Sequence, residues 1–211
     1  MTYEEIIHNP DYAEIKSIEH SEIKNLVINE IVNNQGSARI GNMYQIVGVL
    51  AFVLGGFKAF MPFYLNRETV FLVWLGIGLV FTFTFLIALH ELIHAVAYKF
   101  VGARHLSFGI VWRKFLFYVQ ADREVLNYKQ FKTVAMAPAV IVGILSVLGM
   151  AIFYNQPAFY FFLPIFSFHS FFCSGDFGLL CFFENRPEME VFTFDIKEEG
   201  KAYFYGKKKT I

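Results

Sequence analysis

The sequence predicts an α-helical membrane protein with about four transmembrane helices and a short cytoplasmic or interfacial β-hairpin between the second and third. Of its 211 residues, 56% are hydrophobic and 17% are charged, and the mean hydropathy is +0.46. A typical soluble domain is about 45–50% apolar and about 25% charged. In addition, four long apolar stretches follow one another, and basic residues gather in one segment between them. Both features are typical of a multi-span membrane protein.

The N-terminal residues 1–42 are polar and mixed in charge. They have no basic start that leads into an apolar run, so we expect no cleaved signal peptide. Within them, residues 12–33 space their isoleucines and leucines among acids and lysines, which predicts an amphipathic helix in solvent or on the membrane surface. Residues 36–41 are expected to form a linker.

The apolar stretches are each long enough to cross a bilayer, which takes about 20 mainly apolar residues. The predicted spans are residues 43–65, 70–100, 133–154 and 157–183, within a transmembrane domain of residues 43–184. The second apolar stretch is the most continuous and runs from Val70 to Ala88 without a charge. The fourth contains Pro164, which predicts a kink.

Orientation follows from the basic residues of the short loops, which favour the cytoplasm. The loop between the third and fourth spans has none, whereas the segment between the second and third is rich in them: Lys99, Arg104, Arg113, Lys114, Arg123, Lys129 and Lys132. We therefore expect residues 101–132, the N-terminal segment and a C-terminal tail of residues 185–211 to be cytoplasmic, in a protein of the cell membrane.

Between the second and third spans, residues 105–112 alternate polar or small residues with apolar ones, and residues 115–119 are rich in strand formers. This pattern predicts a β-hairpin that turns at Arg113 and Lys114.

Charge and cysteine usage exclude other classes of protein. With 18 basic and 18 acidic residues, the chain lacks the basic surface that binding nucleic acid requires. Its two cysteines, Cys173 and Cys181, lie about 12 Å apart on a helix by rise alone, too far for a disulfide.

The second span contains the pattern HELIH, from His90 to His94. Residues at i and i+4 share a helix face, so both imidazoles can bind one metal ion, with Glu91 beside it. Catalytic zinc keeps one position for water and lowers its pKa to about 7, and a carboxylate then takes the proton. Ionisable side chains in a span cost about 2.5–3.5 kcal/mol each, which favours a compensating role such as metal binding. The alternative is an interfacial polar cluster beside the basic segment.

A third ligand is expected at the same depth on another helix, and Asp176 is the only acid in the fourth predicted span. Its alternative role is that of a buried hydrogen-bond partner or ion-pair member. His169, seven residues earlier, is expected to be a hydrogen-bonded core histidine, with support of a ligand or polarisation of a substrate carbonyl as alternatives.

The order of these motifs resembles that of the bacterial membrane-bound zincin peptidases, which are distantly similar to site-2 intramembrane metalloproteases. The resemblance covers about residues 70–205. It rests on HELIH, the strand-like residues 106–119, Ala137-Pro138, Ser174-Gly175-Asp176 and residues 194–203. It implies that His90, His94 and Asp176 bind zinc and that Glu91 is the general base. Site-2 proteases usually carry Leu-Asp-Gly at the third ligand, whereas Gly175 precedes and Phe177 follows Asp176 here.

The predicted function is that of a zinc-dependent metallopeptidase that cuts a membrane-spanning peptide within or beside the bilayer, near its cytoplasmic face. The alternative from another class is a non-catalytic metal-binding scaffold or transporter-like protein. Zinc-dependent hydrolysis of a lipid or a small amide would use the same activation of water. Iron, cobalt or manganese can occupy the same ligands.

Overall fold

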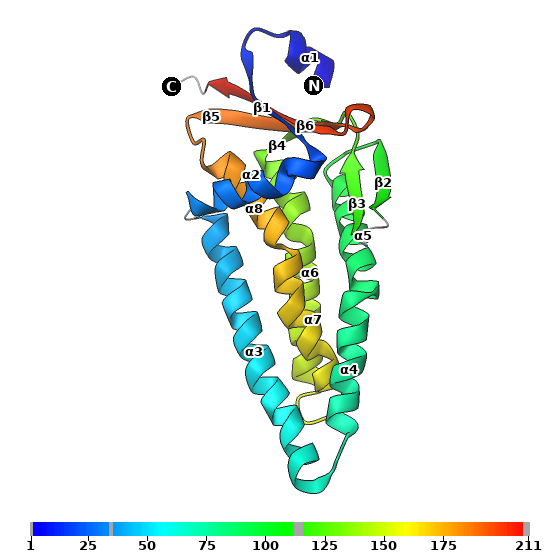
Figure 1. Cartoon of the computed structure of the whole chain (residues 1–211). Helices are drawn as coiled ribbons and strands as arrows, with labels where there is room; N and C mark the ends of the chain where they lie inside the picture. The colour runs from blue at the N-terminus through cyan, green and yellow to red at the C-terminus, as the bar shows by residue number, and fades with distance from the viewer. Residues whose placement is uncertain (1, 34–35, 112–115, 209–211) are drawn as a thin grey trace. The chain divides into compact units, whose positions relative to one another are not determined.

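The computed structural model describes residues 2–33, 36–111 and 116–208, and Figure 1 shows its helices and strands. The helices are α1 (Tyr3–His8), α2 (Ile23–Val32), α3 (Ser37–Asn66), α4 (Val70–Phe83), α5 (Phe85–Phe100), α6 (Tyr128–Ile152), α7 (Phe159–Phe172) and α8 (Ser174–Glu184). The strands are β1 (Tyr12–Glu19), β2 (Leu106–Val111), β3 (Leu116–Ala121), β4 (Leu126–Asn127), β5 (Met189–Ile196) and β6 (Lys201–Lys208). The chain is therefore mostly helical.

Within the described part of the chain, three helices are long and apolar enough to cross a membrane: α3, α6, and α7 with α8 taken together. Helices α4 and α5 add a fourth candidate if the pair counts as one bent span. These assignments rest on length and composition, and they identify a membrane protein.

The second predicted span, residues 70–100, consists of two helices rather than one straight helix. Helix α4 ends at Phe83, α5 begins at Phe85, and the two are bent by 47°. Two threonine hydroxyls lie at the break: Thr82 Oγ1 donates to the Gly78 carbonyl at 2.7 Å, and Thr84 Oγ1 donates to the Val80 carbonyl at 2.6 Å. Such hydroxyls compete for helical carbonyls and bend helices.

The chain divides into two compact units, one formed by residues 1–39, 91–137 and 175–211, and the other by residues 40–90 and 138–174. In the second unit, which is built of helices, α7 packs closely against α3 and α4. A Cβ on Gly78 would lie 2.4 Å from the Phe161 carbonyl oxygen, and one on Gly48 would lie 2.9 Å from that of Ser167. Small residues thus let these helix backbones approach one another.

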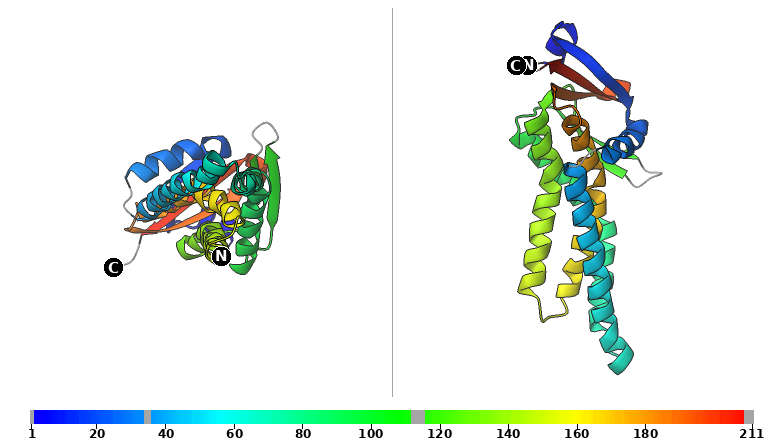
Figure 2. Two further views of the ribbon diagram at one scale, coloured as in Figure 1. Left: turned by 90° about the horizontal axis from the view of Figure 1, so that it is seen from below. Right: turned by 90° about the vertical axis from the view of Figure 1, so that its left-hand side faces the viewer.

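The first unit contains a four-stranded antiparallel sheet in the order β1-β6-β5-β4, which the sequence did not predict (Figures 1 and 2). Its register aligns Tyr12 with Lys207 and Met189 with Lys208. Successive residues of β5 point to opposite faces of the sheet, and both Val191 and Phe192 are buried, so both faces are covered. One face packs Val191 and Phe204 against α2 and α8, and the other packs Phe192 and Phe194 against Ile6 of α1.

The amphipathic helix predicted over residues 12–33 is confirmed for residues 23–32 and is wrong for residues 12–22. Residues 12–19 form β1, a short 3-10 turn follows at His20–Glu22, and only Ile23–Val32 are helical. Pairing with β6, far away in the sequence, overrides the local helical pattern, and it buries Ile18 in the core between the sheet and α8.

The predicted linker at residues 36–41 is replaced by the start of a helix, since α3 begins at Ser37. The Glu184 carboxylate accepts hydrogen bonds from the Ser37 backbone N–H at 2.8 Å and from its hydroxyl at 2.7 Å. An acceptor of this kind satisfies a donor that the first turn of a helix leaves unpaired, which stabilises the helix start.

Strands β2 and β3 form a separate two-stranded antiparallel sheet in which Leu106 faces Ala121 and Val111 faces Leu116. An antiparallel pair between the second and third predicted spans is thus present. The turn predicted at Arg113 and Lys114 lies outside the described residues.

Helix α2 is held to the residues after α8 by a carboxylate. The Arg186 guanidinium donates to both oxygens of Glu30, at 2.9 and 3.1 Å, and the Asn185 side chain donates to one of them at 2.7 Å. Burial opposes ionisation, but the Arg186 and Asn185 hydrogen bonds outweigh it and hold the pKa of Glu30 below its ordinary value.

Replacing Glu30 by Gln should lower the free energy of unfolding by about 1–3 kcal/mol at neutral pH. Because the folded-state pKa is lowered, this stabilisation is present above the unfolded-state pKa and is lost as the pH falls through the folded-state pKa. Melting followed by circular dichroism in detergent, at neutral and at acid pH, measures it. The exposed Glu22→Gln is the control, and a deficit that persists unchanged in acid would contradict the assignment.

Candidate metal centre

Helix α5 carries the HELIH pattern on an unbroken run from Phe85 to Phe100. His90 and His94 lie one turn apart on this helix, and both are buried. Helical spacing therefore directs both imidazoles to the same side of α5. Glu91, the third ionisable residue of the pattern, is half-buried.

The His94 ring is fixed by contacts at both of its nitrogens. Nδ1 lies 3.0 Å from the Val134 carbonyl oxygen, and Nε2 lies 3.4 Å from Asp176 Oδ1. A carbonyl oxygen only accepts hydrogen bonds, so Nδ1 must carry a proton. In a neutral imidazole, Nε2 then presents its lone pair toward Asp176.

The Val134 carbonyl is available to His94 because of a proline four residues later in the sequence. In an α-helix this carbonyl would accept the N–H of the residue four positions later, and in α6 that residue is Pro138. Proline has no backbone N–H. His94 supplies the donor that the helix cannot.

The pair formed by His94 and Asp176 fits zinc. With zinc bonds of about 2.0–2.2 Å to nitrogen and oxygen, two ligand atoms of a tetrahedral site lie about 3.4 Å apart. The Nε2 to Oδ1 separation of 3.4 Å has this value. Backbone carbonyls are also the usual partners of the second nitrogen of metal-binding histidines.

Asp176 lies in the first turn of α8 and is partly buried. Two residues later, Gly178 allows α2 to pack closely, since a Cβ there would lie 2.3 Å from Val27 Cγ1. A Cβ on Gly175 would meet nothing within 4 Å. Of the two glycines near Asp176, only Gly178 is therefore required for close packing.

Glu91 is positioned by strand β3, because the Val119 backbone N–H donates to its Oε2 at 3.0 Å. The paired strand β2 lies on the other edge of β3, so this N–H marks the edge of β3 that β2 leaves uncovered. The sequence could not reveal this partner, since every residue except proline has a backbone N–H and the identity of Val119 does not single it out.

His90 has a different set of neighbours, all within the second unit. Its Nδ1 lies 3.1 Å from Nε2 of the buried His169. The Cys173 sulfur lies 3.6 and 3.8 Å from the two ring nitrogens of His169. The sequence pointed to His169 but not to Cys173 as part of this cluster.

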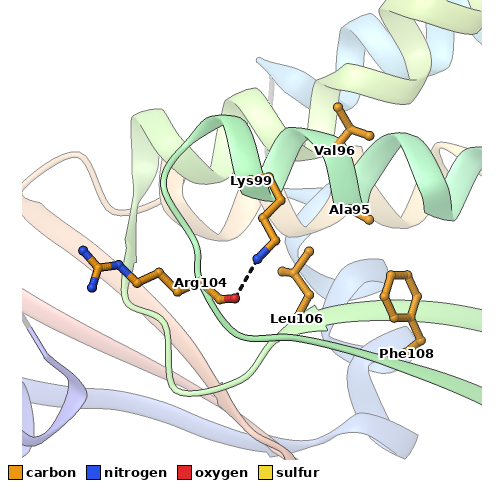
Figure 3. A pocket seen from close by; sticks show the side chains of 6 residues that line it. All are labelled: Ala95, Val96, Lys99, Arg104, Leu106 and Phe108. Carbon is orange, nitrogen blue, oxygen red and sulfur yellow. Dashed lines mark hydrogen bonds between the residues drawn. The ribbon is translucent and has the colours of Figure 1, made fainter.

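An open groove of about 450 Å³ lies beside the end of the HELIH turn, and Figure 3 shows the side chains that line it. They come from α5, from β2 and from the segment between them: Ala95, Val96, Lys99, Arg104, Leu106 and Phe108. Lys99 Nζ donates to the Arg104 carbonyl at 2.6 Å, which ties this segment to the helix. Glu124 accepts from the N–H groups of Arg104 and His105, and although burial opposes it, these bonds lower the pKa of Glu124.

Comparison with known proteins gives one family, and its description accords with this centre. Residues 83–189, about half of the chain, match the family DUF3267, described as "Putative zincin peptidase". The match covers α5, α6, α7 and α8, which carry the histidines and Asp176. No curated protein and no solved structure matches the chain. This protein is a member of the DUF3267 zincin peptidase family.

Proposed function

We propose that the chain is a zinc-dependent peptidase that cuts peptide bonds within or beside the membrane. His90, His94 and Asp176 are the proposed zinc ligands, and Glu91 is the proposed general base. Membership of the family supports a metallopeptidase. The observation that carries the ligand assignment is the His94 ring, held by the Val134 carbonyl at Nδ1 and facing Asp176 with Nε2. His90 joins the set by its position one turn earlier on α5.

Zinc, when bound, supplies a Lewis acid that polarises a carbonyl and lowers the pKa of water to about 7. The residues of the chain do the remaining work. Glu91 takes a proton from the attacking water at Oε1 and passes it to the leaving amine. Val119 holds Oε2 through its N–H and thereby orients the carboxylate. The Val134 carbonyl keeps the His94 ring in one orientation.

The proposed substrate is a membrane peptide in an extended conformation. A helical peptide hides its carbonyls in its own hydrogen bonds, so it must unwind before it is cut. The edge of β3 that faces away from β2 can receive such a segment by strand addition, through backbone groups other than the Val119 N–H that holds Glu91. This edge meets Glu91 at Val119, and the groove beside α5, lined mainly by apolar side chains, offers space for a substrate side chain. The basic residues between the second and third predicted spans favour a cytoplasmic position for the site and for both ends of the chain.

Zinc content should separate ligands from base in detergent-purified protein. His94→Ala and Asp176→Ala should each lose about one equivalent of zinc per chain relative to the wild type, whereas Glu91→Gln should lose none but abolish cleavage. His105→Ala, at an exposed histidine, is the control. If neither His94→Ala nor Asp176→Ala changes the zinc content, the ligand set is wrong. If Glu91→Gln also loses zinc, the metal is structural and the scaffold alternative holds.

Replacing Pro138 by Ala should weaken zinc binding by about 10- to 100-fold, the usual effect of disturbing a partner of a metal-binding histidine. The new N–H would compete with His94 for the Val134 carbonyl. Helix stability should not fall, because alanine favours a helix more than proline does. Competition with a chelator measures the affinity, and Pro62→Ala, inside α3, is the matched control. Equal affinities of Pro138→Ala and the wild type would refute the role of Pro138.

Replacing Val119 by Pro should lower cleavage by about 100-fold, the cost of misplacing a catalytic group by about 1 Å. The substitution removes the N–H that holds Glu91, at an edge position where proline is tolerated. Zinc content should not change. The assay is mass spectrometry of transmembrane peptides in liposomes, counting only products that the wild type forms and Glu91→Gln does not. Val119→Ala keeps the N–H and should remain active; wild-type rates in both variants would exclude this role of Val119.

A further inference from the structure

The second unit contains a cluster of three buried side chains, His90, His169 and Cys173. Only His90 has a role in the proposed reaction. His169 and Cys173 are both inaccessible to solvent, and His90 is nearly so. Burying such groups among apolar helices is costly unless they are satisfied. Helix α7, which carries His169, is rich in phenylalanine.

We propose that His90, His169 and Cys173 form a second zinc site, which the family description does not assign. His90 Nδ1, His169 Nε2 and Cys173 Sγ are its ligand atoms. Each of the three residues offers a ligand atom, and these atoms lie within 4.8 Å of one another. The site goes beyond the proposed peptidase function and shares only His90 with it.

The distances agree with zinc coordination. Two nitrogen ligands of tetrahedral zinc lie about 3.3 Å apart, and a nitrogen and a sulfur lie about 3.6 Å apart, from bond lengths of about 2.0–2.1 and 2.3 Å. The His90 Nδ1 to His169 Nε2 separation is 3.1 Å, and the Cys173 sulfur lies 3.8 Å from that Nε2. Small side-chain movements would bring all three atoms onto one ion.

The sequence spacing favours the same site. His169 and Cys173 stand at i and i+4 at the end of α7, so both side chains project from one side of the helix. Neither cysteine of the chain forms a disulfide. A thiolate with two imidazoles is a ligand set that binds zinc in preference to magnesium or calcium. Binding releases the thiol proton to solvent.

His90 can serve both sites because its ring has two nitrogens on different edges. With both ions bound, the ring also releases its N–H proton to solvent and bridges the ions as an imidazolate. Nδ1 faces His169, and Nε2 is the atom that the proposed catalytic set would use. The two sites therefore differ in chemistry: the catalytic set contains a carboxylate and no sulfur, whereas the second site contains sulfur and no carboxylate. This difference makes them separable by spectroscopy.

Cobalt substitution tests the proposal, since a thiolate bound to Co²⁺ gives a near-ultraviolet charge-transfer band. The full chain loaded with Co²⁺ in detergent should show this band. Cys173→Ser should lose it completely, while Cys181→Ser, at the other buried cysteine, and Asp176→Ala should keep it. A band that is missing from the wild type, or that survives in Cys173→Ser, would overturn the proposal.

A second measurement needs no variant. X-ray absorption at the zinc edge of the wild type should show a sulfur neighbour at about 2.3 Å. Only nitrogen and oxygen neighbours, at about 2.0–2.2 Å, would overturn the second site even if Cys173→Ser failed to fold. Failure of the catalytic set appears differently, as unchanged zinc content in His94→Ala and Asp176→Ala, so the two proposals can fail independently.

Discussion

The hydrogen bond between the His94 ring and the Val134 carbonyl is the interaction on which the candidate metal centre depends. Val134 is buried, and a buried carbonyl without a donor is costly. Pro138 removes the donor that the helix would otherwise provide. His94 Nδ1 replaces it, and the position of the proton on this ring follows. A missing backbone proton in one helix thus sets the tautomer of a side chain on another.

The position of Asp176 depends on segments that lie outside the long apolar helices. Helix α8 begins with the turn that carries Asp176 and is held along its length. Gly178 receives Val27 of α2, and Phe182 packs on Phe204 of the sheet with ring centroids 4.2 Å apart. At its end, Glu184 binds the start of α3. The small sheet therefore acts as a support for one of the proposed ligands.

Sequence patterns predicted the features that depend on local composition. The apolar stretches are one such feature, and they form helices. The spacing of four residues between His90 and His94 is another, and both histidines lie on α5. The four-stranded sheet was not predicted, because the partner of β1 lies at the other end of the chain and long-range pairing decides whether residues 12–19 form a strand. The contacts of Glu91 and His94 with backbone groups were also beyond prediction, although Pro138 was a usable signal for the latter. The Cys173 contact depends on helix packing that spacing alone does not reveal.

The pairing of β1 with β6 has a consequence for biosynthesis. Ribosomes add about 5–20 residues per second, so β1 leaves the ribosome roughly 10–40 s before its partner exists. During that interval its backbone groups are unpaired, a condition that invites pairing with other chains. Glu14, Lys16 and Glu19 place charges along the strand, and such charges discourage association between chains. The same charges that made β1 look like part of a helix thus protect it until synthesis is complete.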